Sequence, residues 1–185
     1  RLGVLRPEDL EPSASALLAK LPRGPNGPLN LMAVLIHNPD ATRAWGRFTG
    51  TLLLDGHLAP RERELLILRT AWNVRSSYEW GNHVQIGLNA GLTAAQIGHL
   101  ADAEPDGEWS IDDRLLIRIA DEVHSLSGMR ADTLGDFLVN HSPADAIEAI
   151  FVVGVYHVVG SLVHSLGVVD EPATPRLGAV EVNAS

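Results

Sequence analysis

The stretch that decides the fold is PRERELLILRTAWNVRSSYEWGNHVQIGLNA, residues 60–90. Pro60 suits the first turn of a helix, and apolar residues recur at helical spacing from there to residue 73. A tight turn at 74–75 leads to a second helix, predicted over 76–90 and ended by Gly91. Because the connection is so short, the two helices are predicted to lie antiparallel and side by side.

Outward from this pair, most of the chain between residues 29 and 169 is predicted to be helical. Further helices are expected at 30–37, 39–54, 93–101, 110–126, 130–139 and 142–166, and strand-like alternation appears only at 167–169. The fold class is therefore all-α, a helical bundle of about seven to eight helices in one domain. Residues 1–28 are predicted to be a proline-rich N-terminal arm with a short helix at 14–20, and 170–185 a C-terminal arm.

Composition narrows the functional classes. The 185 residues include 14 basic and 23 acidic side chains, a formal charge of −9, and no cysteine. The acidic balance gives no electrostatic reason to bind nucleic acid or an anionic membrane. Disulfides, thiolate metal sites and thiol redox chemistry are excluded by the missing cysteine. Unbroken apolar runs are too short to span a bilayer, so we expect a cytoplasmic protein.

One carboxylate lies on a face that should be buried. Glu64 shares a helical stripe with four apolar residues, namely Leu65, Leu68, Ala71 and Trp72. A buried carboxylate needs a partner. Glu64 therefore either belongs to a structural ion pair or is a functional group, and its position on the helix favours neither interpretation. Glu62 and Arg69 fall on a different stripe, more typical of surface charges.

The second helix brings a carboxylate and an imidazole together. Ser76, Glu79 and His83 are spaced i, i+3, i+7 and lie within about 60° of one another on the helix. In an antiparallel pair, Glu64 comes beside His83, so the four groups are expected to line one pocket between the helices. Two aromatic residues, Trp72 and Trp80, are expected to form its walls. A separate stripe is expected to be solvated, and it holds Tyr78, Asn82, Gln85 and Asn89.

The last predicted helix, 142–166, is apolar on nearly all sides, which favours a homo-oligomer. His157, Ser161 and His164 interrupt it at i, i+4, i+7. Packing or subunit contact is the favoured interpretation of these residues. A role for Tyr156 or His157 in binding substrate is the alternative.

These motifs resemble a known family. The stretches RERELLILRTA (61–71), YEWGNH (78–83) and AGLT (90–93), with Tyr156–His157 and SLGV (165–168), are similar to the carboxymuconolactone decarboxylase-like, alkylhydroperoxidase-D-like group. The resemblance extends from about residue 29 to residue 169. It implies an all-helical fold that assembles into dimers, trimers or hexamers.

The resemblance also implies residue positions. The alkylhydroperoxidase-D branch has a C-x-x-C pair, a histidine four residues later and a glutamate twelve residues before the first cysteine. In this chain the glutamate falls on Glu64, the histidine on His83, and the two cysteines on Ser76 and Glu79. Thiol peroxidase chemistry is therefore not expected. The decarboxylase branch also lacks the pair and uses acid–base groups.

Three functions remain open. The first is a cofactor-free, metal-free lyase or isomerase acting on a small organic acid or lactone, in which His83, Glu79 and Glu64 exchange protons. Arg69 or Arg75 would hold the substrate carboxylate, and Ser76 would also contact substrate. The second is a dehydratase or cyclase acting on a larger specialised metabolite. The third is a non-catalytic oligomer. A small polar pocket favours the first, a large apolar pocket the second, and no cavity at these residues the third.

Overall fold

The computed structural model describes residues 2–24, 27–102 and 109–181. Its elements begin with a 3-10 turn, η1 (Pro7–Asp9), a helix, α1 (Pro12–Leu18), and two two-residue antiparallel strands, β1 (Arg23–Gly24) and β2 (Gly27–Pro28). The remaining helices are α2 (Asn30–Leu35), α3 (Pro39–Leu54), α4 (Pro60–Asn73), α5 (Ser77–Asn89), α6 (Ala94–His99), α7 (Ile111–Leu126), α8 (Ala131–Phe137) and α9 (Pro143–Leu166). The all-α prediction is confirmed.

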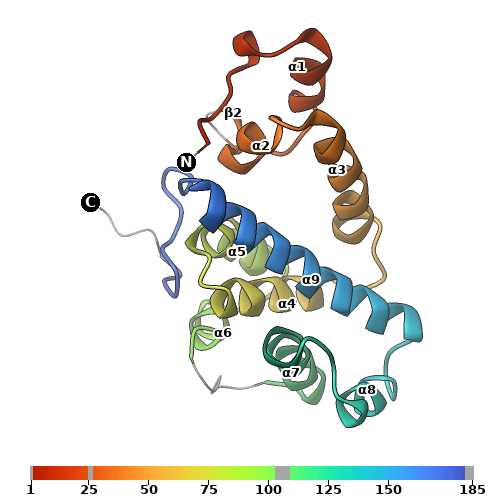
Figure 1. The fold of residues 1–185 in the computed structure, drawn as a ribbon. Helices are drawn as coiled ribbons and strands as arrows, with labels where there is room; N and C mark the ends of the chain where they lie inside the picture. Colours follow the sequence, from red (N-terminus) through yellow and green to blue (C-terminus); the bar gives the residue numbers. More distant parts are fainter. Residues whose placement is uncertain (1, 25–26, 103–108, 182–185) are drawn as a thin grey trace.

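The helices form a bundle around α4. Helix α4 packs against α5, α7 and α9, while α1, α2 and α3 form a layer on one side and α7 and α8 lie on the other (Figure 1). Because neighbours surround α4, its residues 64–71 are all buried, including four consecutive apolar residues from Leu65 to Leu68. The core therefore lies where α4 and α5, the two helices of residues 60–90, meet α9.

Local signals explain where the helices begin and end. Ser110 and Ser142 cap α7 and α9, and each accepts a hydrogen bond from the backbone N–H three residues on. Helix α9 ends at Gly167, whose φ of 70° suits glycine. The strand-like alternation at 167–169 does not form a strand, and the strand pair β1–β2 was not expected. Leu29 is the N-cap of α2.

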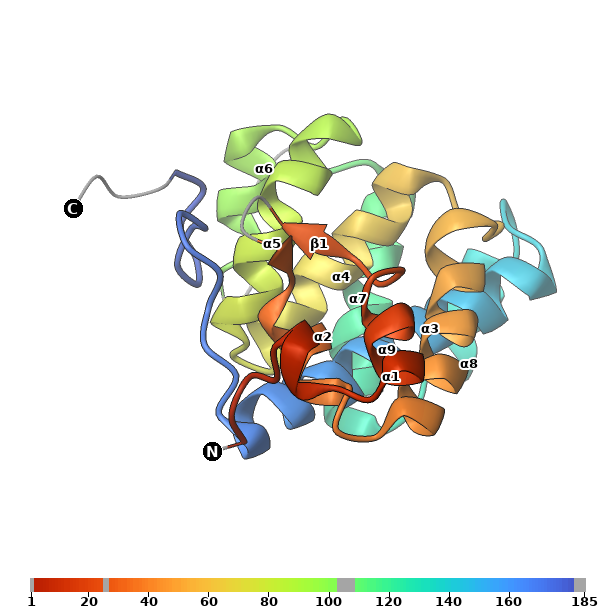
Figure 2. The ribbon, with the colours of Figure 1, turned by 90° about the horizontal axis from the view of Figure 1, so that it is seen from above.

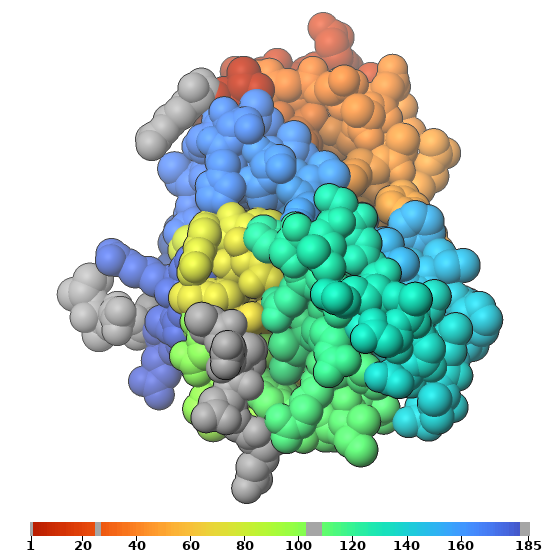
Figure 3. Space-filling view, turned by 60° about the horizontal axis from the view of Figure 1, so that its bottom comes forward, coloured from red at the N-terminus to blue at the C-terminus, as the bar shows by residue number. Residues whose placement is uncertain are grey.

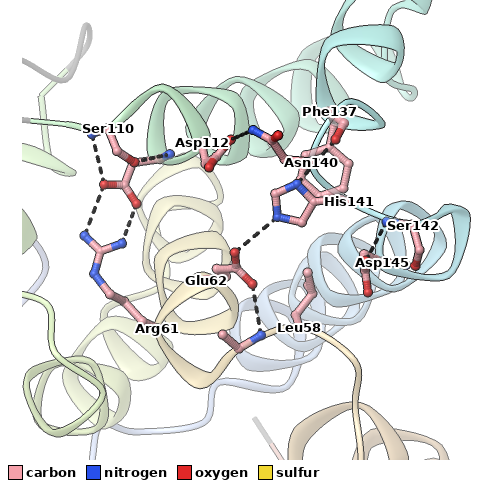
Figure 4. A network of polar contacts seen from close by, with 12 residues as sticks. Leu58, Arg61, Glu62, Ser110, Asp112, Phe137, Asn140, His141, Ser142 and Asp145 are labelled. Atoms are coloured by element: carbon pink, nitrogen blue, oxygen red, sulfur yellow. Dashed lines mark hydrogen bonds and ion pairs between the residues drawn. The ribbon is translucent and has the colours of Figure 1, made fainter.

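A polar network links the N-terminal end of α4 to α7 and to the segment between α8 and α9 (Figure 4). Arg61 donates to both carboxylate oxygens of Asp113 at the start of α7. Glu62, predicted to be a simple surface charge, accepts from the backbone N–H of Ala59 at 2.9 Å and lies 3.2 Å from Nε2 of His141. These contacts fix the N-terminal end of α4, and they use no residue of the candidate site.

Helix α9 is long and apolar enough, by length and composition alone, to cross a membrane. More than half of that apolar stretch is buried against the rest of the bundle, as in the central helix of a helical domain. Its outer side carries exposed Ile147, Ile150, Phe151 and Val158. Phe151 meets Phe48 of α3 edge-on, with ring centroids 5.3 Å apart. In the space-filling view, α3 (orange) and α9 (blue) border the same face (Figure 3).

Both terminal arms pack on the bundle. In the N-terminal arm, Ala14 and Leu18 of α1 form a small second apolar cluster with Ile36. In the C-terminal arm, Glu171 accepts hydrogen bonds from the hydroxyl of Tyr78 and the backbone N–H of Asn30. The backbone carbonyl of Ala179 accepts from the indole N–H of Trp80 at 2.7 Å. The C-terminal arm therefore binds two side chains of α5, those of Tyr78 and Trp80.

Candidate active site

The site is centred on His83 of α5, which lies between two helices. Its Nδ1 is 2.7 Å from Oε2 of Glu64 on α4. The turn that brings the helices together places Arg75 at φ 57°, and Ser76 then caps α5 by accepting from the N–H of Glu79. The sequence therefore located the Glu64–His83 contact correctly, since helical spacing and the short turn were enough to define it.

The other ring nitrogen of His83 faces α9 and Glu79. Nε2 lies 2.9 Å from the hydroxyl oxygen of Tyr156 and 3.9 Å from Oε2 of Glu79. The rings of His83 and Tyr156 meet edge-on, with centroids 5.1 Å apart. All four side chains are buried. The structure thus joins two carboxylates, an imidazole and a phenol from three helices, including Tyr156, for which substrate contact was only the alternative interpretation.

Burial and neighbouring charges set the protonation of this cluster. Burial alone would lower the pKa of His83, but the charge and hydrogen bond of Glu64 outweigh it, so the pKa is raised. Burial raises the pKa of Glu79 to about 7, although the charge of His83 opposes the rise. Burial, followed by the charge of Glu79, raises the pKa of Tyr156, so this phenol stays neutral. Near neutral pH the cluster therefore holds groups that can both give and accept a proton.

A cavity of about 850 Å³ reaches this cluster. Glu79, His83 and Tyr156 line it, whereas Glu64 lies behind His83. Most of its wall is apolar and comes from the N-terminal layer, including Leu31 and Trp45. Cavities of this size hold whole metabolites with most of their surface buried.

Both tryptophans lie outside this cavity, so the prediction that they wall it was wrong. Trp80 is fully buried and bound to the carbonyl of Ala179, and Trp72 meets Trp80 edge-on at 6.3 Å. Arg75 lies over the ring of Trp72, 4.3 Å from its centroid, so it does not reach the cavity either. None of these three residues lines the cavity at His83.

Arg69 also has a different position from the one expected. It is 3% exposed rather than on the surface, and it binds the carboxylate of Asp121 through two nitrogens, at 2.7 and 3.0 Å. It further donates to the backbone carbonyls of Leu100 and Asp102. Arg69 therefore ties α4 to α7 and to the end of α6, and it does not line the cavity.

Two further expected residues lie outside the cavity. Ser76 is buried as the N-cap of α5. Nε2 of His157 is 3.3 Å from Nδ1 of His124 on α7, and burial, with the charge of His124, lowers the pKa of His157. Neither residue lines the cavity, so substrate contact by either is not supported by its position.

Residues that sequence reasoning missed come from three places. Tyr78 was assigned to a solvated stripe, yet it is buried and lines the cavity. Trp45 and Leu31 lie in α3 and α2, which carried no polar signal. Arg63 is mostly buried, with Nε 4.0 Å from Oε1 of Glu64. Its position next to Glu64 on α4 was the available signal, since a charge beside a buried carboxylate is a natural partner.

No group of three or more metal-binding side chains is close enough to hold an ion among residues 2–24, 27–102 and 109–181. Glu64, Glu79 and His83 are arranged in a row through the imidazole, with both ring nitrogens already engaged. The arrangement suits proton transfer along the row.

Comparison with known proteins finds a family that part of the chain resembles. The carboxymuconolactone decarboxylase family model matches residues 39–110, which carry Glu64, Glu79 and His83. Over this segment the chain, which contains no cysteine, resembles that family. A search of curated proteins found no match.

Three solved structures share the fold. A peroxidase-related protein from Ralstonia eutropha JMP134, an alkylhydroperoxidase AhpD core, has a TM-score of 0.81 at 17% identity and covers 93% of this chain and 92% of its own. A protein of unknown function from Agrobacterium tumefaciens has a TM-score of 0.67 at 15% identity, covering 74% and 94%. The debrominase Bmp8, a cysteine-to-alanine variant in complex with 2,3,4-tribromopyrrole, has a TM-score of 0.66 at 10% identity, covering 77% and 76%.

Proposed function

We propose that this protein is an acid–base enzyme, an isomerase, cyclase or dehydratase, that acts on a bulky and largely apolar small molecule. The observation that carries the proposal is the large apolar cavity that ends at Glu79, His83 and Tyr156. Such a cavity favours a larger metabolite over a small organic acid or lactone. A purely structural Glu–His network is disfavoured because the cavity reaches it.

In the proposed reaction Glu79 takes a proton from a carbon next to a substrate carbonyl. A carboxyl group whose pKa is about 7 can do this and can return the proton near neutral pH. The electron pair left on carbon moves onto the carbonyl oxygen as an enolate. The proton then returns at a different carbon in an isomerisation, or it leaves with a hydroxyl group as water in a dehydration.

His83 and Tyr156 stabilise the oxygen of that enolate. In its imidazolium form, His83 donates from Nδ1 to Glu64 and from Nε2 to the hydroxyl oxygen of Tyr156, at the distances observed. The hydroxyl hydrogen of Tyr156 is then free to donate to the substrate oxygen. A neutral phenol held by a cation is a strong donor in a site from which water is excluded.

The test is proton exchange with solvent. A panel of hydrophobic enones, lactones and β-hydroxyketones is incubated with the protein in D2O, and mass spectrometry follows deuterium uptake or loss of water. We expect at least one compound to react, Glu79→Gln and Tyr156→Phe to lose the reaction about 100-fold or more, and His157→Gln, outside the cavity, to retain it. A Glu79→Gln variant with undiminished turnover would contradict the proposal.

A further inference from the structure

The cavity wall opposite the acid–base groups carries a cluster of positive charge. Four cationic side chains line the cavity: Lys20, Arg23, Arg43 and Arg47. We call them the cationic rim. They come from the segment after α1, from β1 and from α3, so they lie on the N-terminal layer, opposite the wall formed by α5 and α9. Figure 2 shows α1 and β1 on the near side, with α3 beside α1.

The rim is at the mouth of the cavity. All four side chains are exposed to solvent while they line the cavity, whereas Glu79, His83 and Tyr156 at the other wall are buried. The residues between are mainly aliphatic, together with Trp45. The cavity therefore has a charged entrance, an apolar middle and a proton-transfer end.

The charge at the mouth of the cavity is opposite in sign to the net charge of the chain. The whole chain has a formal charge of −9, with 14 basic residues, and four of those 14 surround this one opening. Among the described residues that line the cavity, Glu79 is the only acidic one, and it is buried at the far end. Arg43 pairs with exposed Asp40 at 2.9 Å. In the part of the chain that the structure describes, no carboxylate lies within ion-pair distance of Lys20, Arg23 or Arg47.

From this arrangement we propose that the cavity takes amphipathic organic anions. The apolar body of the ligand lies among the aliphatic side chains and Trp45, and its carboxylate or phosphate group lies at the cationic rim. Unpaired guanidinium groups bind both kinds of anion, and a cluster of like charge at an apolar opening attracts an anion to it. This inference rests on the proposed function where the bound anion is also the substrate. In that case the cationic rim holds the anionic group, and the opposite end of the substrate meets Glu79.

Binding of three ligands with the same alkyl chain tests the proposal by isothermal titration calorimetry at pH 8. The ligands are decanoate, decyl phosphate and decanol, each below its aggregation concentration. We expect at least one of the anions to bind the wild-type protein about tenfold more tightly than decanol at low salt, the sum of two or three partly solvated ion pairs. The advantage should shrink in 0.5 M salt. Which anion shows it identifies the head group.

A matched pair of double variants locates the effect. Arg23→Gln with Arg47→Gln should abolish the advantage of the anions and leave the affinity for decanol unchanged. Arg114→Gln with Arg118→Gln removes the same charge from exposed positions on α7 that do not line the cavity, and it should keep the advantage. Equal binding of all three ligands, no binding of any, or equal losses in both double variants would overturn the proposal.

The same variants separate two other outcomes. If the rim serves an anionic membrane surface, Arg23→Gln with Arg47→Gln will weaken binding to phosphatidylglycerol vesicles while decanoate binding stays the same, and the proposal fails. Because the readout is binding, it does not depend on turnover. The acid–base mechanism is tested by turnover in D2O and the rim by binding, so failure of one and failure of the other give different results.

Discussion

His83 is held from both sides, by Glu64 at Nδ1 and by Tyr156 at Nε2. Replacement by glutamine leaves an amide that can still donate to Glu64, so we expect His83→Gln to change the free energy of unfolding by less than about 1 kcal/mol. Replacement by leucine removes the donor and leaves Glu64 buried without it, at a cost of about 3 kcal/mol or more. Urea denaturation of both variants measures the difference, and equal losses in the two would show that the histidine serves packing alone.

Glu79 should make stability depend on pH. Its pKa is raised from 4.5 to about 7 in the folded state, so the folded protein holds a proton that the unfolded chain has released between these values. Stability from this group is therefore complete below about pH 4.5 and is lost as pH rises through 7, by about 3 kcal/mol in all. The raised pKa of His83 acts in the same direction, since its contribution is present below about 6.5 and is lost as pH rises further.

The comparison variants are Glu79→Gln and Glu11→Gln, the second at an exposed position. Unfolding free energies at pH 5 and pH 8 should show a smaller pH-dependent loss for Glu79→Gln than for the wild type. Glu11→Gln should follow the wild type. A wild-type protein that becomes more stable between pH 5 and pH 8 would be inconsistent with a buried, proton-holding Glu79.

The sequence predicted which residues of α4 and α5 lie at the same height along the helix pair. It did not predict the direction in which each side chain points. Glu64 and His83 were correctly paired, because an antiparallel helix pair fixes their heights. Trp80 and Arg69 were placed beside the pocket by the same argument and are not there. The side to which a residue points depends on how each helix is rotated against α7 and α9, and that rotation is set by packing among distant segments.

At the scale of elements, α9 passes very close to the turn between α4 and α5. A Cβ added at Gly160 would lie 2.8 Å from Cγ2 of Val74, and Val74 has a branched side chain that cannot easily move. We expect Gly160→Ala to lower the free energy of unfolding by about 1–3 kcal/mol. Gly154→Ala on the same helix meets nothing within 4 Å and should raise stability by up to about 1 kcal/mol. Thermal denaturation of the pair checks this, and equal shifts would contradict the close approach.

Helix existence was predictable at this scale, because proline at first turns and serine caps are local signals. The two-residue strands were not, since they depend on how the proline-rich segment folds back toward α2. The apolar side chains of α2 and α3 that line the cavity were also beyond local pattern. An apolar residue that faces a cavity has the same sequence signature as one that faces the core.

At the scale of the whole molecule, the exposed apolar side chains on α9 and α3 favour self-association. Five apolar side chains there are between 40% and 56% exposed, namely those of Phe48, Ile147, Ile150, Phe151 and Val158. The rings of Phe48 and Phe151 are in contact. We therefore expect a homo-oligomer, and we expect Phe151→Glu to dissociate it. Leu126→Glu, on the exposed end of α7, is the control and should not. Light scattering that gives 19.9 kDa for the wild-type protein at micromolar concentration would refute the prediction.

The two walls of the cavity belong to different parts of the chain. Glu79, His83 and Tyr156 come from α5 and α9, at the centre of the bundle, while the entrance and much of the apolar wall come from residues 17–54. Core helices that support one another tolerate little change, whereas the N-terminal layer has its own small apolar cluster and can vary separately. In evolutionary terms, a lineage with this architecture can acquire new ligands by remodelling residues 17–54 while the cluster of Glu79, His83 and Tyr156 stays intact.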